Sequence, residues 1–363
     1  MSILEKSAIE AILKTFIDPN TGTDLVSAKS VKSISIDGNH VSVAISLGYP
    51  AKSYLEPLKN AIQQALQTLD GVSEINVTVE VKIISHAVQQ NLKPQANIKN
   101  IIAVASGKGG VGKSTTAVNL ALALAAEGAR VGILDADIYG PSIPMMLGLS
   151  GLPTSEDGKT MLPKIAYGIQ SISIGYLIPP DQAMIVRAPI AVNALQQLLR
   201  DTRWDNVDYL IVDLPPGTGD IQLTLAQKVP VTGAVIVTTP QDIALLDARK
   251  GFKMFEKVGI KILGVVENMS THICSKCGHE EHIFGSGGGA KMCNDYGVDL
   301  LGSLPLDIRI REQADSGTPT VAVDPDGVIS KEYKKIARRI AVKVAEMAQD
   351  HSAIFPKIVI KNT

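Results

Sequence analysis

The sequence has few cysteines, few aromatic residues and no excess of charge of either sign. Only 3 of its 363 residues are Cys, too few for a disulfide framework in a chain of this length, so we expect free thiols in a reducing compartment. Lys plus Arg number 35 and Asp plus Glu number 36. A net charge of -1 supplies no general attraction to nucleic acid, and we expect no nucleic-acid partner.

Long hydrophobic runs are also missing. No apolar run reaches the roughly 18 residues that suggest a membrane span. The first residues, MSILEKSAIEAIL, lack the charged region, apolar region and cleavage site of a signal peptide. Hydrophobic residues still make up 45% of the chain, which is ample for a buried core. We therefore expect a cytoplasmic, globular protein that does not bind membranes.

Residues 1–90 are predicted to form a small α+β domain with the order α-β-β-α-β. Apolar residues follow helical spacing from Ile9 to Phe16 and again over 54–69. Two β-rich runs, 31–37 and 40–47, flank Asp37-Gly38-Asn39 and predict a hairpin, and 75–84 predicts a third strand. A polar segment with Pro94, 85–98, suits a linker, and we place the linker proper at 91–98.

Residues 99–363 are predicted to form an α/β domain with a mostly parallel sheet covered by helices on both faces. Short apolar runs without polar alternation are typical of strands buried on both sides. They lie at 101–105, 131–135, 169–174, 209–213, 234–238 and 262–266, with a last candidate at 300–304. Helical segments separate most of them. An amphipathic helix near 329–347 is expected to dock on the sheet.

A glycine-rich loop follows the first of these strands. Residues 101–114 read IIAVASGKGGVGKS, which matches the phosphate-binding pattern G-x-x-x-x-G-K-[ST] between a strand and a helix at 114–127. Backbone N–H groups of such a loop cradle phosphates, Lys113 would reach the β- and γ-phosphates, and the Ser114 hydroxyl would bind Mg²⁺. The predicted ATP-binding residues are Gly107, Lys108, Gly109, Gly110, Val111, Gly112, Lys113, Ser114 and Thr115.

Two acidic segments complete the predicted P-loop NTPase site. Asp137, in LDADIYGPS, is the residue we place beside the attacking water. Asp213 ends the strand YLIVD, where a carboxylate suits Mg²⁺ binding through water. Gly217, four residues later, is a candidate sensor of the γ-phosphate. Lys108, Lys113, Asp137 and Asp213 are thus the predicted catalytic set.

Lys108 lies too early in the loop to be the ordinary phosphate lysine. Here the sequence resembles the deviant Walker ATPases, which include MinD, ParA, ArsA and the nitrogenase iron protein, with the signature K-G-G-x-G-K-[ST]. In that class the early lysine crosses a dimer interface to the partner's nucleotide. The resemblance implies an ATP-dependent homodimer in which Lys108 acts in trans, like an arginine finger.

A loop downstream carries a pair of cysteines. Cys274 and Cys277 form C-x-x-C within VENMSTHICSKCGHEEHIFGSGGG, a spacing that suits one face of a metal site or a redox pair. The polar, glycine-rich surroundings do not favour a redox pair. Zinc bound by Cys274, Cys277, His279 and His282 is one possibility, although His279 follows Cys277 too closely for usual zinc-finger spacing.

An iron–sulfur cluster is the other possibility for this loop. Such a cluster normally needs four thiolates, and the loop offers two. A symmetric dimer would bring two loops to one axis and supply all four. The third cysteine, Cys293, is interpreted as a filler residue.

Several motifs together resemble the Mrp/ApbC family of iron–sulfur cluster carrier ATPases. They are GKGGVGKST, DADIYGPS, DLPPGTGD, ENMS followed by CSKCG, IFGSGGG and PLDIRIREQADSGTP. The resemblance implies a [4Fe–4S] cluster on Cys274 and Cys277 of both chains, ATP and Mg²⁺ as cofactors, and transfer to apo iron–sulfur proteins from cluster scaffold proteins. It also implies that Asn268 recognises adenine. Many members have Pro where this chain has Ser275.

The N-terminal domain resembles a small domain found in iron–sulfur targeting factors and fused to many of these carriers. It contains no Cys, so its part in cluster handling would be indirect. Two other functions stay open at this point. One is a MinD- or ParA-type spatial regulator, which the cysteine loop and neutral charge disfavour; the other is a zinc-stabilised ATP-binding adaptor.

Overall fold

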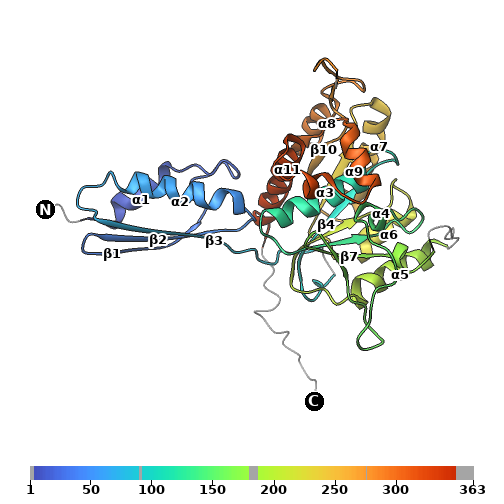
Figure 1. Ribbon diagram of the computed structural model, residues 1–363, viewed down its shortest axis with the longest axis horizontal. Helices are drawn as coiled ribbons and strands as arrows, with labels where there is room; N and C mark the ends of the chain where they lie inside the picture. The colour runs from blue at the N-terminus through green and yellow to red at the C-terminus, as the bar shows by residue number, and fades with distance from the viewer. Residues whose placement is uncertain (1–3, 90–91, 180–186, 275, 349–363) are drawn as a thin grey trace.

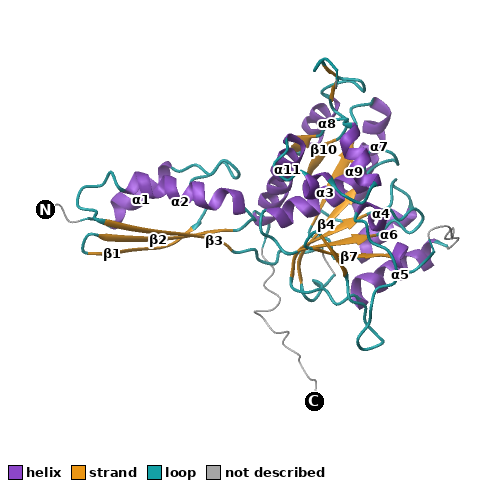
Figure 2. Cartoon of the chain, viewed as in Figure 1, coloured by secondary structure: helices purple, strands orange, loops and turns teal. Residues whose placement is uncertain are grey.

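The computed structural model describes residues 4–89, 92–179, 187–274 and 276–348. Two domains lie next to each other along the long axis of the molecule (Figure 1). The N-terminal domain contains α1 (Lys6–Thr15), β1 (Val31–Asp37), β2 (His40–Leu47), α2 (Lys52–Leu66) and β3 (Glu74–Val81). The predicted hairpin is confirmed, since β1 and β2 pair antiparallel. β3 joins β2 in parallel, and both helices cover one face of this sheet (Figure 2).

The second domain is built on an eight-stranded sheet in the order β13-β10-β9-β4-β8-β5-β7-β6. Its strands are β4 (Ile98–Ala105), β5 (Val131–Asp135), β6 (Lys164–Ala166), β7 (Ile169–Ser173), β8 (Val207–Asp213), β9 (Gly233–Thr238), β10 (Ile262–Glu267) and β13 (Leu300–Ser303). All neighbours are parallel except β6 and β7. A separate two-stranded sheet pairs β11 (His272–Ile273) with β12 (Glu280–Glu281).

Helices cover both faces of the large sheet, as predicted (Figure 2). They are α3 (Lys113–Ala126), α4 (Ile143–Met146), η1 (Ile174–Tyr176), α5 (Ala188–Asp201), α6 (Asp220–Lys228), α7 (Asp242–Lys257), α8 (Gly288–Tyr296), α9 (Ile308–Asp315), α10 (Thr320–Val323) and α11 (Val328–Ala345). Successive side chains of β4 point to opposite faces of the sheet and so into two different hydrophobic cores. Ile102 and Val104 belong to the core beneath α3 and α11, whereas Ile101 and Ala103 belong to the core beneath α5 to α8. The fold class is confirmed.

The core beneath α3 and α11 continues into the N-terminal domain. Glu127, which caps the C-terminal end of α3, is 2% exposed and lies at the junction. Ser53 donates its hydroxyl to this carboxylate at 2.8 Å, and Arg338 of α11 forms an ion pair with it at 3.0 Å. The N-terminal domain is therefore packed against the helix that follows the phosphate loop.

The segment predicted as a linker, 85–98, is partly packed as well. His86 is 1% exposed, and its Nδ1 lies 2.9 Å from Oδ1 of Asn100. Gln89 donates from Nε2 to the carbonyl oxygens of Ala226 and Val229 at the end of α6. β4 begins at Ile98, the last residue of the predicted linker. Ile98 is buried and is paired with Val207 of β8.

Candidate functional site

The phosphate loop joins β4 to α3 at the carboxyl end of the sheet. Gly110 and Gly112 have φ values of 81° and 79°, a left-handed conformation that side chains disfavour. A Cβ at Gly107 would collide with the backbone of Asp247 in α7. Gly110 and Gly112 thus allow the loop to turn between β4 and α3, and Gly107 allows it to approach α7 closely.

A cavity of about 230 Å³ opens above this loop. Its walls combine the loop with residues of the segment that follows β5, including Asp137, and with Pro216, three residues after Asp213. The lining residues are Ser106, Lys108, Gly109, Gly110, Gly112, Lys113, Ser114, Thr115, Asp137, Ser142, Met146 and Pro216. Most of the predicted nucleotide residues are thus brought together around one space. Ser142, Met146 and Pro216 are additional wall residues that sequence patterns did not single out.

Lys113, which lines this cavity, forms a buried ion pair with Asp213. Lys113 Nζ lies 2.5 Å from Asp213 Oδ1, with the two side chains 6% and 0% exposed. The same Nζ donates to the Ser114 hydroxyl at 3.1 Å. Among the described residues, Asp213 Oδ2 is buried without a hydrogen-bond partner. Asp213 and Ser114 thus share Lys113 Nζ as a partner, and their oxygens fit Mg²⁺, which prefers oxygen ligands.

Asp135 is a functional residue that the sequence analysis missed. It ends β5 opposite Asp213 of β8, and its carboxylate accepts hydrogen bonds from Asp137 N, Ile143 N and Ser173 Oγ. Burial and, after it, the Asp213 carboxylate raise the pKa of Asp135 to about 7, although these hydrogen bonds act to lower it. Asp135 therefore shapes the loop that presents Asp137. Its position at a strand end, two residues before Asp137, was the available signal.

Asp137 itself faces the cavity. Burial raises its pKa, whereas the positive charge of Lys113 acts in the opposite direction. Its carboxylate accepts a hydrogen bond from Gly140 N at 3.3 Å. A half-buried carboxylate with a raised pKa beside the phosphate loop is well placed to orient or accept a proton from water.

Lys108, the predicted trans lysine, and Gly217, the candidate γ-phosphate sensor, are placed differently. Lys108 is partly exposed on the cavity wall. Gly217 is not part of that wall; its N–H donates to the Ser106 carbonyl at 2.9 Å, with a φ of 101°. The segment after Asp213 is therefore attached to the first residue of the phosphate loop.

Asn268 lies behind the phosphate loop. It is 8% exposed, and its Nδ2 donates to the Val111 carbonyl at 2.9 Å. Neither residue lines the cavity. In this structure the Asn268 amide is a support of the phosphate loop.

The cysteines lie on the small β11–β12 hairpin. Cys274 N donates to the His279 carbonyl, and Gly278 N donates to the Cys274 carbonyl, each at 2.9 Å. Gly278 adopts a φ of 72°, so the chain turns back directly after Cys277. Backbone N–H groups of Cys277 and Lys276 lower the pKa of the Cys274 thiol, which favours the thiolate that binds metals. Cys277 is exposed and Cys274 partly exposed. Ser275 lies outside the described residues.

The histidines of this loop have other partners. His282 Nδ1 lies 2.9 Å from the Ser270 carbonyl oxygen, and His272 Nδ1 lies 3.0 Å from that of Leu306. Within the described parts of the chain, no three His, Cys, Asp or Glu side chains are grouped to hold a metal ion. The four-ligand zinc set is therefore not assembled in this structure. Cys293 is 2% exposed on α8, where it belongs to the hydrophobic core, and burial raises its pKa to about 11.

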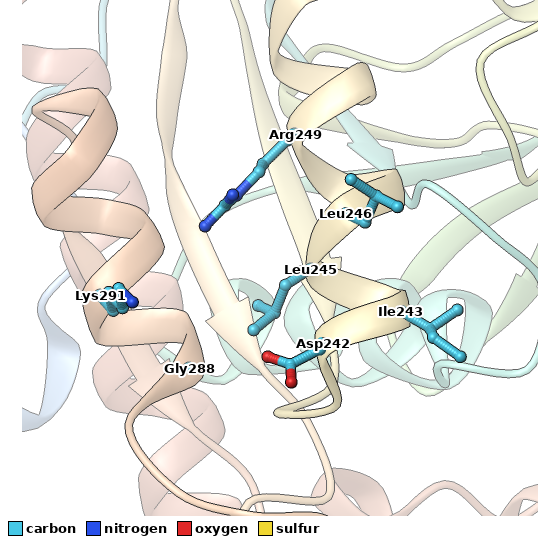
Figure 3. A pocket seen from close by; sticks show the side chains of 7 residues that line it. All are labelled: Asp242, Ile243, Leu245, Leu246, Arg249, Gly288 and Lys291. Carbon is cyan, nitrogen blue, oxygen red and sulfur yellow. The ribbon is translucent and has the colours of Figure 1, made fainter.

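A second, larger hollow of about 360 Å³ lies between α7 and α8 (Figure 3). Asp242, Ile243, Leu245, Leu246, Arg249, Gly288 and Lys291 line it. Arg249 forms an ion pair with Asp295 at 3.4 Å. None of the predicted site residues lines this hollow, so size does not identify the nucleotide site here.

Comparisons with known proteins agree with this arrangement. The model of the NUBPL iron-transfer P-loop NTPase family matches residues 97–341. The chain belongs to this family. A second family model, described as iron-sulfur cluster assembly protein, matches residues 6–79, which lie in the N-terminal domain. The resemblance inferred from the motifs is confirmed.

Individual relatives match between about two thirds and nearly all of the chain. An iron-sulfur cluster carrier protein of Haemophilus influenzae is 50% identical over 341 residues, covering 94% of this chain and 92% of the relative. The mouse iron-sulfur cluster transfer protein NUBPL is 47% identical, covering 76% and 86%. A nucleotide-binding protein of Archaeoglobus fulgidus, solved in complex with ADP, has a TM-score of 0.56 and 36% identity, covering 64% and 90%. Among the described residues, no helix is long and apolar enough to cross a bilayer.

Proposed function

We propose that this protein is a homodimeric iron–sulfur cluster carrier that binds and slowly hydrolyses ATP with Mg²⁺. The family establishes a P-loop NTPase. One observation carries the cluster proposal: each chain presents two thiols, Cys274 and Cys277, on an exposed hairpin without a third ligand grouped beside them among the described residues. Two copies would supply the four thiolates of a [4Fe–4S] cluster.

The nucleotide site supports hydrolysis through positioning and charge. Backbone N–H groups of the loop and Lys113 would bind the phosphates, and Asp137 would orient the attacking water. Mg²⁺ held by Ser114 and, through water, by Asp213 would neutralise charge on the β- and γ-phosphates. Lys113 must release Asp213 to reach phosphate, since its Nζ is now 2.5 Å from that carboxylate. Lys108 would complete the site of the partner copy.

The proposed cargo defines the proposed partners. A cluster held on exposed thiols can be passed to apo iron–sulfur proteins and received from scaffold proteins, because ligand exchange needs access to the cluster. We propose neither nucleic acid nor membrane as a partner. The three free cysteines favour a reducing compartment, and the cytoplasm is our proposed location.

Anaerobic reconstitution with iron and sulfide tests the proposal. We expect about four irons and four sulfides per dimer in the wild type and none in the Cys274→Ala/Cys277→Ala variant. Cys293→Ala is the matched control, because it removes a thiol that is buried in the core. Zinc in place of iron in the purified protein, or equal iron in the wild type and the double variant, would refute cluster carriage on these cysteines.

A further inference from the structure

A four-residue turn, 267–270, connects the phosphate loop with the segment that carries the cysteines. It begins with Glu267, the last residue of β10, and continues through Asn268, Met269 and Ser270. The segment that follows, 271–287, is called the cysteine loop below; it ends where α8 begins. The 267–270 turn therefore supports one end of the cysteine loop.

One side of the turn is attached to the phosphate loop. Besides the Asn268 Nδ2 bond to the Val111 carbonyl, this amide packs against Gly112, where a Cβ would collide with Nδ2. The Met269 methyl group lies 3.9 Å from the same position. Val111 and Gly112 precede α3 directly, so a rearrangement of the loop around phosphate displaces the surface on which Asn268 rests.

The other side of the turn closes the cysteine loop at its base. Glu267 is 3% exposed. Its Oε1 accepts the Ser270 hydroxyl at 2.9 Å, and its Oε2 accepts Gly289 N at 2.6 Å. Ser270 precedes the loop and Gly289 follows it, so a single carboxylate holds both ends. The Ser270 carbonyl also contacts His282 Nδ1 at 2.9 Å.

Gly288 and Gly289, at the start of α8, are packed tightly against their neighbours, so the hydrogen bond between Glu267 and Gly289 cannot shift alone. A Cβ at Gly289 would lie 2.6 Å from Glu267 Oε2, and one at Gly288 would lie 2.5 Å from Leu245 Cδ1 and 2.7 Å from the Pro240 carbonyl oxygen. Figure 3 shows Leu245 of α7 directed toward α8, at whose start Gly288 lies. The start of α8 is thereby fixed against α7, and Glu267 is its link to the turn.

Met269 between these two attachments has a φ of 58°. A left-handed conformation is unusual for any residue other than glycine. It costs free energy, so it persists only where the surrounding structure holds it. Here Asn268 is held by the phosphate loop and Ser270 by Glu267. The turn is thus held at both ends.

We propose that Glu267 is a positioning residue that couples the nucleotide state of the phosphate loop to the placement of Cys274 and Cys277. Asn268 transmits movement of Val111 and Gly112 to the 267–270 turn, and Glu267 transmits it to both ends of the cysteine loop. The inference rests on the proposed function, because the coupling would be the means by which ATP alters cluster affinity. Coupling of this kind is reciprocal between the two sites.

The test measures thiol alkylation in the full-length protein without a cluster. Rates for Cys274 and Cys277 are followed by peptide mass spectrometry, with and without Mg²⁺ and a non-hydrolysable ATP analogue; buried Cys293 serves as internal reference. We expect the analogue to change the wild-type rates on the order of fivefold. In Glu267→Gln the change should be reduced while analogue affinity is kept, because the neutral amide has one acceptor oxygen in place of two and loses the charge that strengthens the bonds from Ser270 Oγ and Gly289 N.

Two further variants make the outcome decisive. Glu281→Gln removes an exposed carboxylate from the hairpin itself and should respond like the wild type. Ser270→Ala removes one of the two bonds and should weaken the response, so it gives a result even if Glu267→Gln does not fold. Two results would overturn the inference. One is a wild-type response in Glu267→Gln, and the other is a wild-type alkylation rate that the analogue does not change. Cluster carriage is judged separately by the iron counts above.

Discussion

At the scale of single residues, the most consequential contact is the ion pair of Lys113 and Asp213. Both side chains are buried, and charges removed from water need a partner. In the proposed mechanism, the pair would keep Lys113 in place until phosphate replaced the carboxylate. Asp213 Oδ2, which lacks a hydrogen-bond partner among the described residues, would then be a ligand for Mg²⁺ through water.

Replacing Lys113 therefore tests the phosphate site directly. Lys113→Ala should weaken ATP binding by about tenfold to a hundredfold, the usual value of a charge-assisted hydrogen bond. Isothermal titration with Mg²⁺-ATP measures this change. Lys253→Ala, an exposed lysine on α7, is the matched control. Unchanged affinity in Lys113→Ala would contradict the assignment of the loop.

At the scale of elements, the site depends on parallel strands that end at one edge of the sheet. β4, β5 and β8 are neighbours and deliver the phosphate loop, Asp135 and Asp213 to the same place. Their opposite ends are tied by Asp208 of β8, which is 5% exposed. Lys99 Nζ and Arg130 Nη2 donate to its carboxylate at 2.8 Å and 3.0 Å.

These ties predict a pH-dependent stability. Burial acts to raise the pKa of Asp208, but the hydrogen bonds from Arg130 and Lys99 together lower it below the ordinary value. A lowered folded-state pKa stabilises the protein above the unfolded value of about 3.9, and this stabilisation is lost as the pH falls through the folded-state pKa. Asp208→Asn should thus cost about 2 kcal/mol at pH 7 and progressively less below pH ~4.

Urea unfolding across this pH range provides the measurement. Asp205→Asn, an exposed position just before β8, is the control and should change the free energy of unfolding little at any pH. A difference between wild type and Asp208→Asn that stays constant from neutral to acidic pH would show that the carboxylate charge is not the stabilising feature.

At the scale of the whole molecule, the N-terminal domain is part of the same core as the P-loop helix. Arg338 of α11 is central to the junction. It pairs with Glu127 at the end of α3 and donates to Ser53 Oγ at 2.8 Å and Asn20 Oδ1 at 3.3 Å. The end of α3 opposite the nucleotide site is thus in contact with the N-terminal domain.

Loss of Arg338 should therefore destabilise the protein as a unit. Arg338→Ala leaves the buried Glu127 carboxylate without its cation, which costs about 3 kcal/mol in comparable pairs. Chemical unfolding measures the loss, and Lys335→Ala, an exposed ion-pair residue of the same helix, should change stability by less than about 1 kcal/mol. Equal effects of the two substitutions would mean that the junction contributes little.

The proposed dimer can be tested by mixing two inactive variants. Lys108→Ala keeps Asp137, and Asp137→Asn keeps Lys108. If Lys108 acts on the partner's nucleotide, each mixed dimer contains one complete site, and random mixing should restore about a quarter of the wild-type ATPase rate. The rate of phosphate release before and after mixing is the measurement. A mixture as inactive as its components would contradict the trans role.

Much of this protein follows from local sequence features. The short apolar runs around 101–105, 131–135 and 209–213 determine buried parallel strands, because their side chains alternate between two helix-covered faces. GKGGVGKS determines the phosphate loop, since only glycine tolerates the turns at Gly110 and Gly112. The spacing of the paired cysteines likewise predicts a metal-binding or redox site.

Other features depend on contacts between residues far apart in the chain. The Lys113–Asp213 pair joins positions 100 residues apart, and the Asn268 contact with Val111 spans 157. Burial of Asp135 and Glu267, which gives them their positioning roles, arises from neighbouring strands and helices rather than from adjacent residues. The packing of the predicted linker and of the N-terminal domain on α3 has the same origin. Sequence patterns report local conformation and burial periodicity, whereas the tertiary structure alone decides which polar groups become partners.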